Sequence, residues 1–299
     1  MKPLLDLYKL SLFLTVAETK SFTRTAEKFL LHQSSISLHI ASLEKSLDVT
    51  LFDRKGRQAT LTEAGQLLRP FAQRLLQESD TAIEALEAFK GVIRGQLHIG
   101  ASTTPGAWLL PRWLGQFQER YPNVAIDLEI GNSEQVLNWL LDGKVAVAVV
   151  GFEPDALLFV TTPIITDEIV LTVGNGHPWI CEAFVTLDMV NAARLICRET
   201  GSATRRVAEE QLGQHCCQIR PSLELGSTTA IKQAVMANLG AAFLPKMTLK
   251  AELAAGDLSI VPVAGVTIHR SFYIVQSRQR WQSPATNAFC ETLLSREGG

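Results

Sequence analysis

The stretch SFTRTAEKFLLHQSSISLHIASLEKSL, residues 21–47, predicts two short helices joined by a tight turn. Hydroxyls at Ser21 and Thr23 are typical of a helix start. After a break near Leu31 and His32, apolar side chains return every three or four residues, which is the repeat of one helix face. These side chains are Ile36, Ile40, Leu43 and Leu47. Because only about three residues separate the helices, they must cross steeply, as in a helix-turn-helix. A preceding helix is predicted by Leu5, Tyr8, Leu12 and Val16, so the first 60 residues form an all-α head.

The helix predicted around residues 33–47 presents an outward face that is hardly charged. Its side chains are small and polar apart from one leucine: Ser34, Ser37, Leu38, Ala41 and Lys45. A helix that only keeps a protein soluble carries Glu and Lys there, whereas one that enters the major groove of DNA needs short hydrogen-bonding side chains. We therefore expect this face to contact DNA bases, with a solvated helix face as the alternative.

Residues 51–62 predict a short hairpin with Gly56 at its turn and three cations around it, Arg54, Lys55 and Arg57. Such a wing straddles the phosphate backbone while Lys55 or Arg57 enters the minor groove. A solvated basic turn is the alternative. The charge agrees with a DNA footprint at this end, because residues 1–74 hold 11 Lys/Arg against 7 Asp/Glu in a chain of net charge −2.

A long helix is predicted at residues 63–90, capped by Thr62 and bent at Pro70. Its apolar seam advances in steps of four and three: Leu68, Ala72, Leu75, Ala82, Leu86 and Phe89. A helix of about 28 residues is about 42 Å long, too long to bury this seam on the head alone. We therefore expect it to pair with a copy of itself, and we expect residues 91–95 to form a hinge.

From residue 96 onward, strands and helices alternate, which is typical of an α/β domain with parallel sheets. Residues 158–164 and 169–173 are predicted to be separate strands. The length fits two subdomains. We place the first at about residues 96–162 and 268–299 and the second at about residues 163–267.

Three strand-to-helix junctions combine hydroxyls with free backbone amides. The positive end of a helix favours an anion, and ligands bind at the carboxyl edge of open parallel sheets. Simple helix capping is the alternative at each junction. We expect these junctions to form one anion site from Ser102, Thr103, Thr104, Thr200, Gly201, Ser202, Thr204, Ser227 and Thr228.

Composition and missing motifs exclude other classes. With 46% hydrophobic and 19% charged residues, the chain has full cores. No uncharged apolar run approaches the ~18 residues of a membrane span, and the N-terminus lacks a signal-peptide pattern. We expect a cytoplasmic protein without membrane contact. Nucleophile elbows, phosphate loops, metalloprotease helices and dinucleotide fingerprints are absent. We therefore expect no enzyme activity, metal site or cofactor.

Four segments of the first 65 residues resemble the LysR-type transcriptional regulators in order and spacing: FLTVAE at 13–18, SFTRTAE at 21–27, LFDR at 51–54 and LTEAG at 61–65. The later α/β units match too, so the resemblance covers essentially the whole chain. It implies a winged helix-turn-helix at 1–62, a linker helix at 63–90, and a two-subdomain effector domain at 96–299 like periplasmic binding proteins. It also implies a dimer of dimers that bends promoter DNA in response to a small inducer and contacts RNA polymerase.

The family's recognition helix typically opens with SQPAVSR, and the matching run here is HQSSISL at residues 32–38. By this resemblance Gln33, Ser34 and Ser37 contact DNA. We also expect the neighbouring His39 to contact DNA. His32 replaces the usual capping serine, and Leu38 replaces the usual arginine. We expect Leu38 to contact a thymine methyl group or another apolar base edge.

In the sensor, GAST at 100–103 and RETGSATR at 198–205 resemble family members that control carbon dioxide fixation or sulfur assimilation genes. Their ligands are small anions, either phosphorylated metabolites or sulfur oxyanions. The alternative is a redox switch, as in the peroxide-sensing branch of the family, with a disulfide between Cys197 and either Cys216 or Cys217. Its weakness is that Cys197 falls in a predicted buried strand, where a thiol is poorly ionised.

Overall fold

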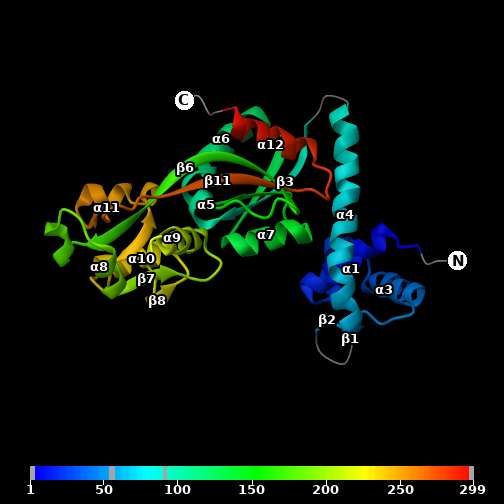
Figure 1. Cartoon of the computed structure of the whole chain (residues 1–299). Helices are drawn as coiled ribbons and strands as arrows, with labels where there is room; N and C mark the ends of the chain where they lie inside the picture. The colour runs from blue at the N-terminus through cyan, green and yellow to red at the C-terminus, as the bar shows by residue number, and fades with distance from the viewer. Residues whose placement is uncertain (1–3, 54–57, 90–92, 296–299) are drawn as a thin grey trace. The chain divides into compact units, whose positions relative to one another are not determined.

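The computed structural model describes residues 4–53, 58–89 and 93–295. The chain divides into two compact units, residues 1–90 and 91–299, and each has its own hydrophobic core (Figure 1).

The first unit contains the predicted three-helix head, a short hairpin and the long helix. Its elements are α1 (Leu7–Thr19), α2 (Phe22–Lys28), α3 (Gln33–Leu47), β1 (Phe52–Asp53), β2 (Thr60–Leu61) and α4 (Glu63–Phe89). The starts of the helices follow from local chemistry. The Ser21 hydroxyl accepts a hydrogen bond from the Arg24 amide at 3.3 Å, and the Thr62 hydroxyl accepts one from the Gly65 amide at 3.1 Å. Both caps are therefore confirmed.

The head closes around one core to which α1, α2, α3, the hairpin and the start of α4 contribute. Fully or nearly fully buried members are Leu10, Phe13, Val16, Ala26, Ile36, Ile40, Leu43, Leu51, Phe52 and Ala72. The Glu44 carboxylate of α3 accepts hydrogen bonds from the amides of Leu51 at 2.7 Å and Phe52 at 3.3 Å, which ties α3 to the hairpin. At Gly65 a Cβ atom would lie 2.3 Å from the Leu51 carbonyl oxygen, so α4 packs this closely only with glycine there.

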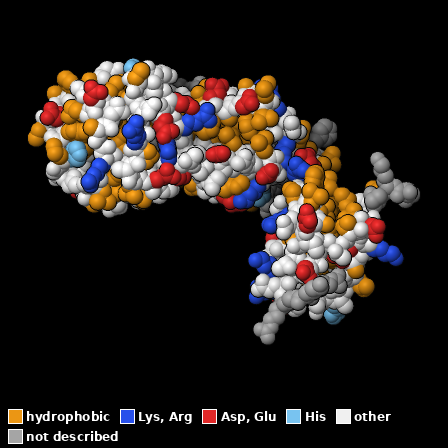
Figure 2. Space-filling view, turned by 60° about the horizontal axis from the view of Figure 1, so that its bottom comes forward, with side chains coloured by type: hydrophobic (Ala, Val, Ile, Leu, Met, Phe, Trp, Pro, Cys, Tyr) orange, Lys and Arg blue, Asp and Glu red, His pale blue; other side chains and the backbone are white. Residues whose placement is uncertain are grey.

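Helix α4 does not present the single seam that the sequence predicted. Ala72 is fully buried and Leu68 packs against the head core. The exposed apolar stripe instead combines Leu67 and Phe71 with Leu75 and Leu86, and Figure 2 shows hydrophobic side chains gathered over this helix. The physical reason is that the head core covers Leu68 and Ala72 in the first turns of α4. The exposed apolar residues there are therefore the preceding ones, Leu67 and Phe71.

The second unit is built on a mixed sheet with the strand order β10-β6-β11-β5-β3-β4, and β9 pairs with β6. These strands are β3 (Gly95–Ser102), β4 (Val124–Gly131), β5 (Val147–Val150), β6 (Phe159–Gly174), β9 (Ala242–Pro245), β10 (Leu258–Ile260) and β11 (Ile268–Ser277). A parallel pair consists of β7 (Leu195–Arg198) and β8 (Pro221–Leu225), and Leu195 forms a bridge to Ala241, the residue before β9. The helices of this unit are α5 (Thr103–Trp108), α6 (Leu110–Arg120), α7 (Ser133–Asp142), α8 (Leu187–Ala192), α9 (Ala203–Gly213), α10 (Thr228–Met236), α11 (Lys250–Ala255) and α12 (Pro284–Leu294), with short 3₁₀ turns at Pro178–Cys181 and Lys246–Thr248.

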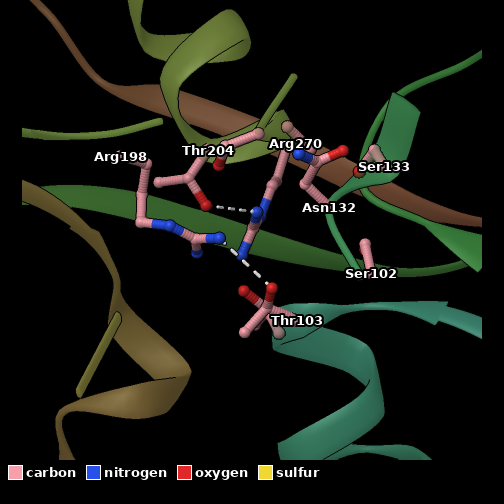
Figure 3. A pocket seen from close by; sticks show the side chains of 10 residues that line it. Ser102, Thr103, Asn132, Ser133, Arg198, Thr204 and Arg270 are labelled. Atoms are coloured by element: carbon pink, nitrogen blue, oxygen red, sulfur yellow. Dashed lines mark hydrogen bonds between the residues drawn. The ribbon is translucent and has the colours of Figure 1, made fainter. Parts of the chain in front are cut away.

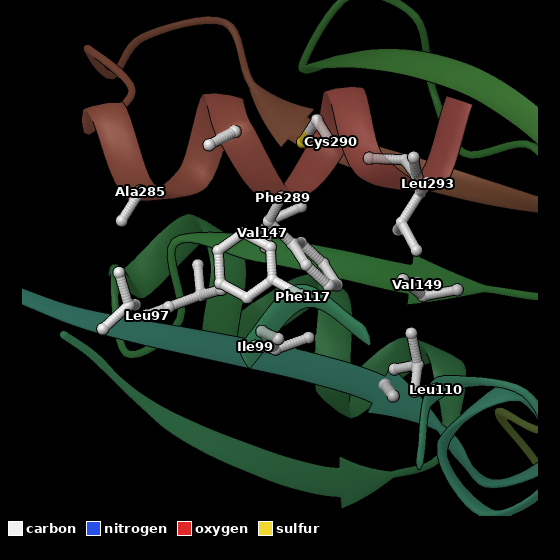
Figure 4. Close-up of a cluster of buried hydrophobic side chains, with 14 residues drawn as sticks. Leu97, Ile99, Leu110, Phe117, Val147, Val149, Ala285, Phe289, Cys290 and Leu293 are labelled. Carbon is white, nitrogen blue, oxygen red and sulfur yellow. The ribbon is translucent and has the colours of Figure 1, made fainter. Parts of the chain in front are cut away.

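Two lobes share the long strands β6 and β11. Lobe I comprises residues 95–150 and 284–294, and lobe II comprises residues 187–260. In lobe I, Val147 and Val149 of β5 pack with Phe117 of α6 and Phe289 of α12 on one sheet face (Figure 4). Alternate residues of the same strand pack with α7 on the opposite face. Both faces are buried, as expected for the parallel strands of an α/β unit.

Two sequence-based expectations for this unit are wrong. Residues 158–164 and 169–173 are not separate strands, because β6 runs unbroken from Phe159 to Gly174. Its polar centre interrupts the hydrophobic pattern, but the ladder with β11 continues. Ile164 of β6 is the extra residue of a bulge in this ladder, next to Pro163, which cannot donate a backbone hydrogen bond. The sheet is also not parallel throughout, because β11 is antiparallel to both β5 and β6. Among the described residues, no helix is both long and apolar enough to cross a membrane.

Leu30 offers a test of the local energetics of the head. It follows α2 with φ 53°, and the Leu31 amide donates to the Ala26 carbonyl, which is the helix-ending pattern that usually has glycine at this position. Its side chain is 93% exposed, so little packing is lost on removal. We expect Leu30→Gly to stabilise the head by about 0.5–1 kcal/mol. Hydrogen exchange of the α2 and α3 amides should slow by about two- to fivefold.

Leu4→Gly is the matched control, because Leu4 is 86% exposed but does not have a positive φ. Equal or faster exchange in the Leu30→Gly protein would show that the left-handed backbone at this position carries no strain.

Candidate functional site

The main candidate site lies between the two lobes, where three strands of the second unit end and a helix begins. These junctions are β3 to α5, β4 to α7 and β7 to α9. The cavity is lined by Ser102, Thr103, Thr104, Asn132, Ser133, Arg198, Ser202, Ala203, Thr204 and Arg270 (Figure 3). We call these residues the cleft site. Its volume is about 10 Å³, the size of a single water molecule.

Two helix N-termini at the cleft site have no side-chain cap. Ser102 precedes α5 and Ser202 precedes α9, and neither serine makes a capping hydrogen bond, although both are at least 95% buried. By contrast, Ser227 caps α10 and Asn132 caps α7 through a capping box. The capping interpretation therefore holds for α10 but not for α5 or α9. In the described part of the chain, the buried Ser133 hydroxyl has no hydrogen-bond partner.

Arg198 reaches the cleft site from the end of β7 and is 4% exposed. Its Nη1 donates to the Thr228 hydroxyl at 3.0 Å, and its Nη2 donates to the Thr103 hydroxyl at 3.2 Å. Thr228 belongs to lobe II and Thr103 to lobe I, so one guanidinium bridges the lobes. The Glu199 carboxylate supplies its negative charge at 2.7 Å.

Arg270 enters from the middle of β11 and is 5% exposed. Its Nε and Nη2 donate to the Asp167 carboxylate of β6 at 3.2 and 2.9 Å, and its Nη1 donates to the Thr204 hydroxyl at 3.0 Å. Burial lowers the pKa of Arg270, and the nearby Arg198 charge lowers it further, while Asp167 opposes the shift. The group stays cationic, so a second positive charge faces the cavity.

The structure brings together most of the residues predicted for the effector. Ser102, Thr103, Thr104, Ser202 and Thr204 line the cavity, while Thr228 holds Arg198 and the Gly201 carbonyl accepts a hydrogen bond from the Glu134 amide at 3.4 Å. Two of the predicted residues do not line this cavity: Thr200 is exposed in a turn, and Ser227 caps α10. The sequence analysis did not assign Asn132, Ser133, Arg198 or Arg270 to the site. The helix start at Asn132 and Ser133 and the RETGSATR segment that begins with Arg198 were the signals for the first three. Arg270 lies on the buried face of β11.

The second candidate site is the outward face of α3. Gln33 and Ser34 are exposed, and Leu38 is 71% exposed. Ser37 and His39 are half-buried, and the His39 ring packs edge-on against Tyr8 with ring centres 5.4 Å apart. His39 therefore has a packing role in the head. Arg54, Lys55 and Arg57 lie outside the described residues.

Fold and sites together define a DNA-binding regulator that carries its own effector-binding domain. Residues 7–66 match the model of the bacterial regulatory helix-turn-helix protein, lysR family, and residues 90–297 match the LysR substrate binding domain. The chain belongs to the LysR family of transcriptional regulators, so it is a DNA-binding regulator and not an enzyme.

Relatives along the full length are named as transcriptional regulators. A probable RuBisCO transcriptional regulator of Guillardia theta is 34% identical over 293 residues, which cover 96% of this chain and 94% of that protein. The HTH-type transcriptional activator CmpR of Synechocystis is 30% identical over 291 residues, covering 97% and 95%.

Two solved structures are similar. The regulatory domain of CcmR from Synechocystis PCC6803, in complex with 2-PG, is 28% identical with a TM-score of 0.63, covering 68% of this chain and 97% of that domain. Full-length CbnR complexed with its target DNA is 21% identical with a TM-score of 0.72, covering 98% and 100%, which shows the shared fold.

The thiol-switch alternative is not supported. Burial raises the pKa of Cys197 to about 11, so almost none of it is the reactive thiolate at neutral pH. Burial also raises the pKa of Cys217, and its thiol lies 3.3 Å from the Asn191 side-chain oxygen. Cys216 is exposed, whereas Cys197 is half-buried.

Thiol labelling at pH 8 checks this conclusion. We expect two fast thiols, the exposed Cys181 and Cys216, and three slow ones, Cys197, Cys217 and Cys290. With a pKa of about 11, the rate at Cys197 should rise about tenfold per pH unit up to that pH, because the thiolate fraction grows in that proportion. A Cys197 rate equal to that of Cys216 would contradict the raised pKa, and labelling in denaturant provides the count of five.

Proposed function

We propose that this chain binds promoter DNA through α3 and the hairpin, and that a small anion held at the cleft site controls DNA bending and promoter activation. One observation carries the effector part of the proposal. Two buried guanidinium groups, Arg198 and Arg270, and two uncapped helix N-termini meet at one cavity between two lobes.

Anion binding follows from the donors at the cleft site. The amides at the start of α5 and α9 lack side-chain acceptors, and a helix N-terminus carries partial positive charge. The buried Ser133 hydroxyl adds a donor without a partner among the described residues. Charge-assisted hydrogen bonds are roughly twice as strong as neutral ones. An oxyanion supplies the acceptors that this arrangement lacks.

Binding must also move parts of the domain. A cavity of about 10 Å³ holds one water, so a phosphate or sulfur oxyanion needs side chains or lobes to shift. The lobes touch through Arg198 with Thr103 and through the Glu134 amide with the Gly201 carbonyl, and β6 and β11 run through both. A ligand that binds one lobe arrangement better shifts the population toward it, in proportion to its differential affinity.

The ligand class is a phosphorylated small acid or a sulfur oxyanion. The CcmR regulatory domain, which covers most of the effector unit at 28% identity, binds 2-PG, and full-length relatives are named regulators of RuBisCO genes. We therefore rank phosphoglycolate first.

Assembly provides the link to DNA. The exposed stripe on α4, which begins with Leu67 and Phe71, fits pairing with a second copy. We propose a dimer of dimers in the cytoplasm that contacts RNA polymerase. Paired heads must reach half-sites about one helical turn apart or multiples of it. A lobe movement that changes head spacing then alters the bend in the DNA.

A thermal-shift series tests the effector site. Sulfite, sulfate, phosphoglycolate and a bisphosphorylated sugar are added separately to the full chain, and at 100 times Kd a binder stabilises the native state by about 2.7 kcal/mol. In the double variant Ser102→Ala with Ser202→Ala, we expect the affinity for the binding anion to fall by about tenfold or more, because two hydroxyls at the open helix ends are lost.

Ser227→Ala is the matched control, since it removes a helix-cap serine outside the cavity. It should lower the melting temperature slightly and leave the ligand-induced shift intact. A double variant that keeps the full ligand-induced shift places the effector elsewhere.

Leu38 tests the DNA part. Leu38→Arg replaces an exposed apolar contact with a donor that prefers guanine. We expect selection from randomised operators to exchange a thymine for a guanine at one position per half-site, at a cost of about 1–3 kcal/mol for the original base. Lys45→Arg on the same helix is the control, because it keeps the charge. Unchanged operator preference in the Leu38→Arg protein would refute the assigned base contact.

A further inference from the structure

The Arg198 guanidinium already holds a carboxylate from its own chain. Its Nε donates to Glu199 Oε2 at 2.7 Å and its Nη2 to Glu199 Oε1 at 2.8 Å. This two-point arrangement is the strongest way in which an arginine binds a carboxylate or a phosphate. The edge of the guanidinium that best recognises an anion is therefore occupied before any effector arrives.

Arg198 and Glu199 differ in how freely their side chains can move. The Arg198 side chain is 3% exposed, whereas the Glu199 side chain is 25% exposed. The Arg198 backbone is held as well, because Arg205 Nη1 donates to the Arg198 carbonyl at 3.1 Å. Glu199 can therefore turn toward water while Arg198 stays in place.

We propose that Glu199 is an internal competitor of the effector: its carboxylate occupies the Arg198 edge in the ligand-free protein, and an effector oxyanion takes its place. This inference rests on the proposed anion site and adds what sets the effector's affinity. It also explains how a buried guanidinium is tolerated without ligand, since an unpaired buried charge is strongly destabilising. Arg198 has a carboxylate or an effector anion beside it in both states.

The exchange has a direct path to the lobes. Glu199 begins the turn in which the Ser202 amide donates to the Glu199 carbonyl at 3.2 Å, and the Gly201 carbonyl of this turn accepts from the Glu134 amide of lobe I. When the Glu199 side chain leaves Arg198, the turn that contacts lobe I loses one of its anchors. Release of the competitor and loosening of a contact between the lobes are thus one event.

Calorimetric titration of the full chain with inorganic phosphate and with phosphoglycolate tests the proposal. Glu199→Gln keeps the shape of the side chain but removes the charge that competes. We expect its Kd for these anions to fall by about tenfold relative to the unchanged protein, because a charge-assisted pair no longer has to be broken. Glu199→Asp keeps the net charge but is shorter by one methylene, so it should also bind more tightly.

Glu210→Gln is the matched control. Its carboxylate pairs with Arg206 at 2.8 Å on the exposed side of α9, so it loses the same charge without freeing Arg198. Its Kd should stay within about twofold. If Glu210→Gln lowers the Kd as much as Glu199→Gln does, the change in affinity comes from the overall charge of the protein, and the proposal is wrong.

The sign of the affinity change separates the outcomes. If the unchanged protein binds an anion and Glu199→Gln binds it equally or more weakly, Glu199 only positions Arg198 and the competitor role is wrong, while the anion site stands. If only the Glu199 variants bind, the competitor role is supported directly. If neither binds either probe, the competitor role fails together with the anion site.

Discussion

A guanidinium group removed from water must keep an anion and several acceptors around it, and this constraint organises the effector unit. Arg270 and Asp167 satisfy it at the centre of the two long strands, where both side chains are at least 92% buried. Breaking such a pair leaves a bare charge and costs about 3–5 kcal/mol, so β6 and β11 are held in one register at this point. The Thr204 hydroxyl accepts a further hydrogen bond from Arg270, and the Thr103 hydroxyl of lobe I accepts one from Arg198.

The same constraint bears on the proposed effector site. The arginines of the cleft site are satisfied without ligand, but the start of α5, the start of α9 and the Ser133 hydroxyl have no such partner among the described residues. In the function that we propose, an oxyanion completes these open hydrogen bonds, and the Glu199 carboxylate limits how tightly the oxyanion binds. Selectivity would then depend on how many of these donors one ligand can satisfy at once.

The sequence revealed the elements whose burial repeats regularly. Helices α1, α2 and α3 bury one face each, so Ile36, Ile40 and Leu43 marked their core side correctly. The sequence predicts two strands in place of β6 because the centre of β6, around Asp167, is polar. Asp167 pairs there with Arg270 of β11, which the local sequence does not indicate. Arg270 shares the buried face of β11 with Ile268 and Phe272, so the alternation of the strand indicated its burial. The sequence around it does not indicate its partner, because Asp167 lies 103 residues earlier in the chain. The sequence did not indicate that Thr200 lies outside the cavity, which follows from the turn that Gly201 forms with φ 89°.

The bond between Glu44 and the start of the hairpin has a consequence for the DNA contacts that we propose. The Leu51 and Phe52 amides are fixed to α3, so α3 and the start of the hairpin cannot slide past each other. If both contact DNA as proposed, the head holds them at one separation, and an operator is bound only if its two grooves present their contacts at that separation.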